Sequence, residues 1–210
     1  PSILTTPDIS AMSSSRYRAD ITAGSLKLAE SRIIAGLLLR DLTPADWVQA
    51  LRADNVLQVK NPATATRLGR LIRSRLKTMG PELWKLIRDG QGTVAIHAVL
   101  ATAIKHSPLL GDFLHLVVAD QYRRFSPALT KTLFNDYLDA CRERDPLMPQ
   151  WNESTRRRLA SSIFQMLAQA GYIDNSRSLR LLNLHIAEPV LHYLKSHRED
   201  YVLRCIQVAP

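Results

Sequence analysis

The chain has 210 residues, of which 46% are hydrophobic, so it can bury a sizeable core and is not a disordered protein. Its formal net charge is +9, which makes a polyanion such as nucleic acid or an acidic membrane surface a candidate partner. The two cysteines, Cys141 and Cys205, are far apart and neither belongs to a C-x-x-C pair, so the sequence gives no support to a zinc ribbon, a redox dithiol or a secreted disulfide framework.

The first half of the chain is predicted to be helical. Residues 1–15 are rich in Pro, Ser and Thr, and we expect a flexible N-terminal arm there. Capping residues followed by proline mark helix starts at Thr43-Pro44 and Asn61-Pro62, and Gly80-Pro81 begins a further helix. The expected helices cover residues 24–40, 44–54, 62–79 and 81–90.

Two apolar helices are expected next, near 93–106 and 108–122, and a helix starting at Ser126-Pro127 follows them. Pro146–Pro149 is predicted to be a loop. We place the domain boundary near residue 125, with the loop as the alternative. This divides the chain into a helical bundle over residues 16–125 and a second domain over 126–210.

The second domain has the element order of a winged-helix module. A helix over 155–170, capped by Asn152 or Ser154, ends at Gly171 and is followed by a polar turn. We expect strands over 178–184 and 201–208 with a short helix from 188 to 196 between them. In a winged helix, one helix enters the DNA groove and the β-wing touches the backbone. The predicted fold class is therefore mainly α, with a small β-wing.

The helix over 62–79 carries the clearest functional pattern. No acidic residue lies between Lys60 and Glu82, and residues 61–110 hold 8 Lys and Arg against 2 Asp and Glu, a net charge of +6. At helical spacing, four basic side chains project opposite the apolar face: Arg67, Arg70, Arg73 and Lys77. Such a row can contact successive phosphates. The alternative is an ordinary solvated face, although such faces usually interleave acidic residues. Arg75 lies nearer the apolar side, where a buried acceptor is expected.

A second basic cluster, Arg156-Arg157-Arg158, begins the helix that ends at Gly171. Positive charge there opposes the helix dipole, and phosphate contact would explain it, with Arg177 and Arg180 on the predicted wing as a further contact. A solvated basic turn is the equal alternative. Three consecutive arginines point in different directions on a helix, and Arg156 is expected to face the core.

Catalytic patterns are missing from the sequence. The six histidines show no metal-binding spacing, Gly90-Gln91-Gly92 lacks the residues of a phosphate-binding loop, and no nucleophile elbow is present. We therefore expect no enzyme activity, no metal, no cofactor and no small-molecule substrate. The apolar stretches fall short of the roughly 18–20 residues that cross a bilayer, and no signal peptide is visible. A cytoplasmic protein without a membrane partner is expected.

Segments spread over nearly the whole chain form a further pattern: 17–25, 28–35, 61–67 with Arg70 and Arg73, Pro81–Trp84, Asp112–Leu114, Trp151–Thr155 and Ala170–Ile173. In these segments the chain resembles the BrxA family, whose members are small components of the bacterial BREX phage-exclusion system. The resemblance implies a non-enzymatic protein that binds double-stranded DNA and has a helical N-terminal part shaped like the antitermination protein NusB. It transfers no catalytic residues.

Together these patterns predict sequence-independent, salt-sensitive docking on duplex DNA. Two alternatives stay open. The chain could be an adaptor that scaffolds larger defence proteins, such as other BREX components, with the basic helix meeting an acidic partner. It could instead bind RNA, as the NusB-like resemblance suggests.

Overall fold

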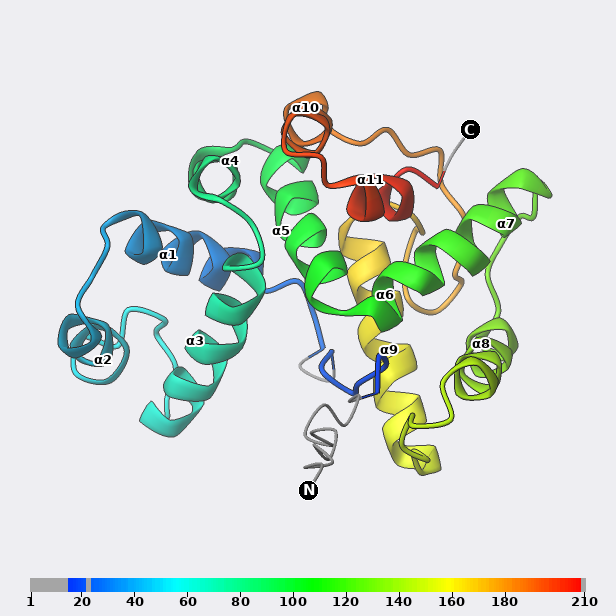
Figure 1. Ribbon diagram of the computed structural model, residues 1–210, viewed down its shortest axis with the longest axis horizontal. Helices are drawn as coiled ribbons and strands as arrows, with labels where there is room; N and C mark the ends of the chain where they lie inside the picture. Colours follow the sequence, from blue (N-terminus) through cyan, green and yellow to red (C-terminus); the bar gives the residue numbers. More distant parts are fainter. Residues whose placement is uncertain (1–14, 22–23, 209–210) are drawn as a thin grey trace, which may run out of the picture.

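The computed structural model describes residues 15–21 and 24–208, and within them the chain is built from helices (Figure 1). Nearly all of the predicted N-terminal arm lies outside the described residues. The mainly α class is confirmed. The elements are α1 (Leu28–Leu39), α2 (Pro44–Arg52), α3 (Pro62–Leu76), α4 (Pro81–Asp89), α5 (Thr93–His106), α6 (Pro108–Asp112), the π-helix η1 (Phe113–Val118), α7 (Ala119–Arg123), α8 (Lys131–Arg144), α9 (Glu153–Gln169), α10 (Glu188–Ser196) and α11 (Asp200–Ile206).

The predicted capping residues begin helices α2, α3 and α9. The side chain of Thr43 accepts a hydrogen bond from the Asp46 amide at the start of α2, and Asn61 accepts one from the Ala63 amide at the start of α3. Asn152 caps α9 in the same way. Gly171 ends that helix with φ of 82°, a left-handed conformation that favours glycine. These predicted helix ends are confirmed.

Helix α5 runs through the middle of the molecule, with α1–α4 on one side and α6–α9 on the other (Figure 1). Its residues from His97 to Ile104 are all buried. A single cluster of buried apolar side chains extends from Tyr17 to Val208 and draws on both predicted domains. The division at residue 125 stays a prediction.

The predicted β-wing is wrong. Residues 178–184 form no strand; they make only isolated bridges, Ile173 with Leu181 and Ala128 with Arg180. The predicted strand over 201–208 is instead α11. Its buried residues Val202, Cys205 and Ile206 follow helical spacing, which places them together on one face against the core.

The pairing of residues 127–129 with residues 179–181 explains why α8 begins later than predicted. The amide of Leu129 donates to the carbonyl of Leu179, and the amide of Leu181 donates to the carbonyl of Pro127. Residues 127–129 are therefore committed to extended pairing, and the helix begins only at Lys131, where the Thr130 side chain accepts from the Leu133 amide. The predicted start at Ser126-Pro127 is wrong for this reason.

No single helix among the described residues is long and apolar enough to cross a membrane. Helix α5 and the segment Pro108–Arg123 meet the length and composition only as a pair, and they are bent by 108° relative to each other.

Candidate nucleic-acid interface

The outer face of α3 is basic. Arg67, Arg70 and Lys77 are exposed, and none of them makes an ion pair or side-chain hydrogen bond with another residue that the structure describes. Because no acidic side chain among the described residues neutralises them there, their positive charge remains available to an anionic ligand at this face.

The remaining arginines of α3 have roles within the fold. The Arg73 guanidinium is partly buried and lies over the Trp47 ring of α2, with its carbon 4.3 Å from the ring centroid. Arg75 is only 1% exposed and donates a long hydrogen bond, 3.5 Å, to the carbonyl of Ser25. Burial lowers the pKa of Arg75. The expectation that Arg75 points inward is confirmed.

The three arginines at the start of α9 have separate environments. Arg156 donates to Asp139 of α8 at 2.8 Å and to the carbonyl of Asn135, so its side chain, 25% exposed, is directed to α8. Arg157 pairs with Glu153 one turn earlier at 2.8 Å. Arg158 is exposed and has no partner among the described residues. Of the three, Arg158 alone can meet a ligand without breaking a pair that the structure describes.

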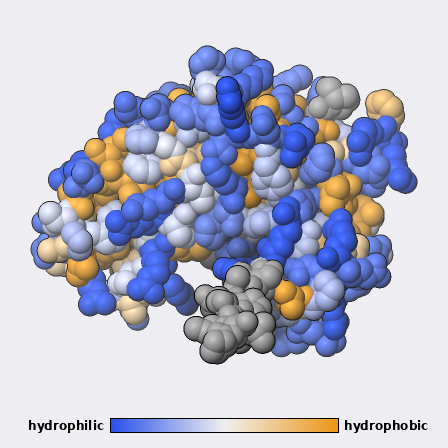
Figure 2. Space-filling view, in the orientation of Figure 1, coloured by the Kyte–Doolittle hydropathy of each residue, from blue (hydrophilic) through white to orange (hydrophobic). Residues whose placement is uncertain are grey.

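Arg158 and Arg67 line the same groove, although they come from distant parts of the sequence. The groove has a volume of about 560 Å³. Each arginine is the sixth residue of its helix, and the N-terminal ends of α3 and α9 point to the same side of the molecule (Figure 1). Figure 2 shows the outline of the molecule indented beside α3. We call this space the Arg67–Arg158 groove; its lining consists of Ala19, Asp20, Lys27, Thr64, Arg67, Leu68, Leu71 and Arg158.

Positive charge dominates the Arg67–Arg158 groove. Lys27 supplies a third cation from the residue before α1, where it has a left-handed φ of 58° and lies 3.8 Å from Glu30. Asp20 is the one carboxylate in the described lining, and it accepts a 2.7 Å hydrogen bond from Ser107. Three cations against one carboxylate make this groove attractive to phosphate. Sequence reasoning missed Lys27, because only the fold brings it beside the two arginines.

Arg177 and Arg180 do not join this surface. They lie in the loop after Gly171, at the opposite end of α9 from Arg158, and α9 is about 25 Å long. Arg180 lies 3.5 Å from Asp174. The two predicted contacts on the wing are exposed, but the structure places them on a different part of the molecule.

A second groove, of about 350 Å³, lies between α2 and α3. We call it the Trp47 groove; it is lined by Trp47, Val48, Leu51, Arg52, Thr66, Arg70 and Arg73. Arg70 therefore lines the Trp47 groove, whereas Arg67, on the same helix, lines the Arg67–Arg158 groove.

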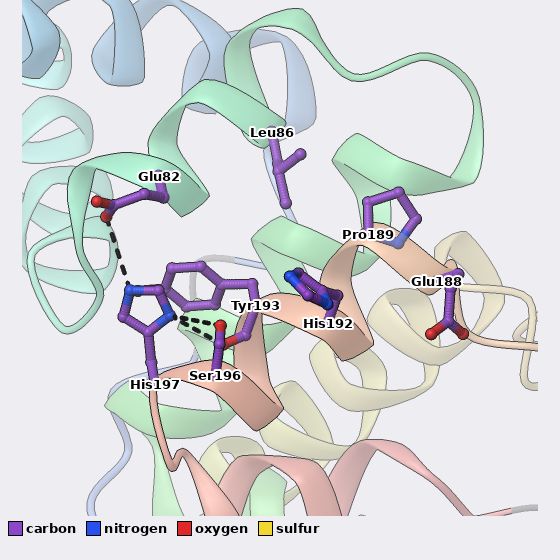
Figure 3. A pocket seen from close by; sticks show the side chains of 8 residues that line it. All are labelled: Glu82, Leu86, Glu188, Pro189, His192, Tyr193, Ser196 and His197. Carbon is purple, nitrogen blue, oxygen red and sulfur yellow. Dashed lines mark hydrogen bonds and ion pairs between the residues drawn. The ribbon is translucent and has the colours of Figure 1, made fainter.

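A third cavity, of about 550 Å³, lies between α4 and α10 (Figure 3). Glu82 and Glu188 are at its rim, and the His197 ring stacks on Tyr193 with centroids 4.0 Å apart and its Nε2 3.8 Å from Glu82. Two carboxylates make this cavity unsuitable for a polyanion. Among the described residues no group of three or more His, Cys, Asp or Glu side chains could hold a metal ion.

Comparison with known proteins settles the family. The sequence model of the BrxA family matches residues 15–198. The chain belongs to the BrxA family. A "BREX protein BrxA" from Paramagnetospirillum magneticum is 54% identical over 198 residues, which cover 94% of this chain and 100% of that protein. Another, from Escherichia coli, is 31% identical over 167 residues, covering 80% of this chain and 78% of that protein.

The fold is also similar to that of a solved chain. The crystal structure of an uncharacterized protein from Magnetospirillum magneticum superimposes with a TM-score of 0.86 at 52% identity, covering 92% of this chain and 100% of that one. All residues of the Arg67–Arg158 groove lie within the part matched by the BrxA family.

Proposed function

We propose that this BrxA-family chain is a non-enzymatic component of a bacterial BREX anti-phage system and that it binds double-stranded DNA. The observation that carries the proposal is the Arg67–Arg158 groove, where cations from α3, α9 and the start of α1 line one surface. The same proposal includes two features of the fold. Residues 16–125 have a NusB-like shape, and residues 126–210 form a DNA-binding module that lacks a wing.

The chemistry of the groove favours contacts with the DNA backbone. Lys27, Arg67 and Arg158 can each meet a phosphate, and Arg70 and Lys77 extend the basic surface along α3. Phosphate contacts fix the position of a protein on the duplex but read no sequence. The described lining of the groove contains no aromatic side chain on which bases could stack. Binding is therefore expected to be largely independent of sequence.

The test is duplex binding measured by fluorescence anisotropy over a salt series. A variant with Lys27→Gln, Arg67→Gln and Arg158→Gln removes three cations from the groove. A matched variant with Lys195→Gln, Arg198→Gln and Arg204→Gln removes three exposed cations that have no ion-pair partner among the described residues, from α10, α11 and the loop between them, away from α3 (Figure 1).

The salt dependence reports how many phosphates the protein neutralises. The logarithm of the binding constant falls with the logarithm of the salt concentration, with a slope of about 0.9 for each neutralised phosphate, because bound counterions are released there. The groove variant is therefore expected to have a slope shallower by about 2–3 than the wild type, whereas the matched variant keeps a slope close to that of the wild type.

Two outcomes would count against the proposal. If the wild-type chain fails to bind duplex at low salt, DNA is not its ligand. If the two variants weaken binding equally, the effect is one of net charge and the groove is not the site. Competition with a structured RNA at the same salt concentration decides between DNA and RNA. If the groove prefers the A-form helix of RNA, the RNA will displace the DNA duplex at a lower concentration than unlabelled duplex does.

A further inference from the structure

The Trp47 groove has a different chemical character from the DNA-binding surface proposed above. Three arginines, Arg52, Arg70 and Arg73, belong to its described lining, which contains no acidic residue. Helix α3 separates it from the Arg67–Arg158 groove, so the two grooves flank the same helix. A ligand of the Trp47 groove must therefore be anionic, but it need not be the DNA that the other groove accepts.

Two of the three arginines of the Trp47 groove, Arg52 and Arg73, are positioned by contacts within the fold. Stacking on Trp47 fixes the plane of the Arg73 guanidinium, and its buried Nε has no hydrogen-bond partner among the described residues. The Nε of Arg52 donates a long 3.4 Å hydrogen bond to Thr66 Oγ1, which directs Arg52 across to α3. None of the three arginines forms an ion pair with a carboxylate among the described residues, so a ligand carboxylate would gain charge-assisted hydrogen bonds from those guanidinium NH groups that face the groove.

The other wall of the groove is apolar. Val48 is 51% exposed beside Trp47, and Leu51 is a buried part of the lining. A sugar-phosphate backbone offers almost nothing to cover an exposed valine. Protein interfaces instead concentrate their binding energy on Trp and Arg surrounded by apolar contacts, and a groove between two helices suits an amphipathic segment. The combination of an apolar wall and a cationic wall favours a protein partner over nucleic acid.

We propose that the Trp47 groove docks an acidic segment with apolar anchor residues, carried by another protein of the same BREX system. The apolar side chains of that segment cover Val48 and Trp47, and its carboxylates meet Arg52, Arg70 and Arg73. This inference goes beyond DNA binding and does not depend on it. It makes the chain a link between the duplex on one flank of α3 and a protein on the other.

The test is site-specific photocrosslinking in cells that carry the complete BREX system. The photoreactive residue p-benzoylphenylalanine replaces Val48, and the same residue at Leu147, which is 59% exposed in a loop outside the groove, is the control. Sequencing of the crosslinked peptide is expected to identify an acidic segment with apolar residues from another BREX protein. Capture at Val48 of DNA, of a second copy of this chain, or of nothing overturns the proposal.

Charge reversal makes the test specific to the arginines. Arg52→Glu with Arg70→Glu changes two exposed side chains and leaves the stacked Arg73 in place. Crosslinking at Val48 is expected to fall at least tenfold and to return when two acidic residues of the captured segment are changed to Lys. Unchanged crosslinking, or a decrease that the compensating change does not restore, rejects the groove as the docking site. Circular dichroism and thermal unfolding that match those of the wild type establish that the fold of the variant is intact.

Discussion

The Arg73 guanidinium carbon lies 4.3 Å from the centroid of the Trp47 ring, so a residue that the sequence marks as a DNA contact also holds α2 against α3. The two helices also approach at Gly69, where an added Cβ would lie 2.7 Å from Leu51 Cδ1 and that side chain would have to shift. Arg73 therefore contributes to helix packing and also lines the Trp47 groove, so substitutions at Arg73 are expected to affect both the packing and the proposed docking.

Arg73→Ala is expected to destabilise the fold by about 0.5–2 kcal/mol, because it removes a partly desolvated cation–π interaction and the packing of the side chain on Trp47. Arg70→Ala, on the exposed crest of the same helix, is expected to change stability by less than about 0.5 kcal/mol. Urea denaturation of the two variants measures the difference. Equal stabilities for the two variants would show that the Arg73–Trp47 interaction contributes nothing to the fold.

The titration of His97 is expected to lower the free energy of unfolding at acidic pH. It is fully buried; its Nδ1 accepts from the Ala187 amide at 3.0 Å, and its Nε2 lies 3.2 Å from the Ala170 carbonyl. Burial lowers the pKa of His97 below its ordinary value of about 6.5. The unfolded chain then binds the proton more readily than the folded chain, so stability decreases as pH falls below about 6.5 and is unaffected by His97 above it.

The measurement for His97 is urea denaturation between pH 5 and 8. His97→Asn offers an acceptor to Ala187 without titrating, and its stability is expected to vary less over the lower part of this range. His106, whose pKa burial also lowers, supplies the pH dependence that is left in the variant. A variant with the full wild-type slope would mean that His97 does not titrate differently on folding.

Asp112 joins three distant segments. It accepts hydrogen bonds from the Tyr17 hydroxyl at 2.9 Å and the Tyr201 hydroxyl at 2.8 Å, and it pairs with Arg16 at 3.0 Å. Asp112→Ala leaves two tyrosine hydroxyls without their acceptor, and we expect a decrease of roughly 2–5 kcal/mol in the free energy of unfolding. Asp112→Asn keeps one acceptor and costs less. Asp120→Asn, which breaks only exposed pairs on α7, is the control, with an expected change below about 1 kcal/mol in thermal unfolding.

Local signals in the sequence predict most of the helices. Thr43, Asn61 and Asn152 cap the helices as expected, because a capping side chain acts only on the next few amides. The predicted wing is wrong where local signals are ambiguous. Residues 201–208 have the β-branched and aromatic content of a strand, yet Val202 and Ile206 are one helical turn apart and are both buried.

The candidate site is predictable only in part. The basic face of α3 follows from periodicity within one helix, so Arg67 and Arg70 can be named from the sequence. Nothing local shows that Arg158 and Lys27 line the same groove as Arg67, since the fold alone joins them. The ion pair of Arg156 likewise cannot be predicted from the sequence, because its partner Asp139 lies on another helix.

The three arginines at the start of α9 are expected to differ in DNA binding. Arg158→Gln should reduce the salt slope of duplex binding by about 0.9, the value for one phosphate, because Arg158 lines the groove and has no partner among the described residues. Arg157→Gln should leave the slope nearly unchanged, since Arg157 is already paired with Glu153 on the exposed helix surface.

Arg156, unlike Arg158, is expected to affect the stability of the fold and not DNA binding. Its hydrogen bonds to Asp139 and to the Asn135 carbonyl join α9 to α8 at the surface, so Arg156→Gln should lower the free energy of unfolding by about 0.5–1 kcal/mol and leave the salt slope unchanged. Anisotropy titrations and urea denaturation on the three single variants separate binding from stability. An equal decrease of DNA affinity in all three would mean that the duplex binds a diffuse basic patch and not a groove.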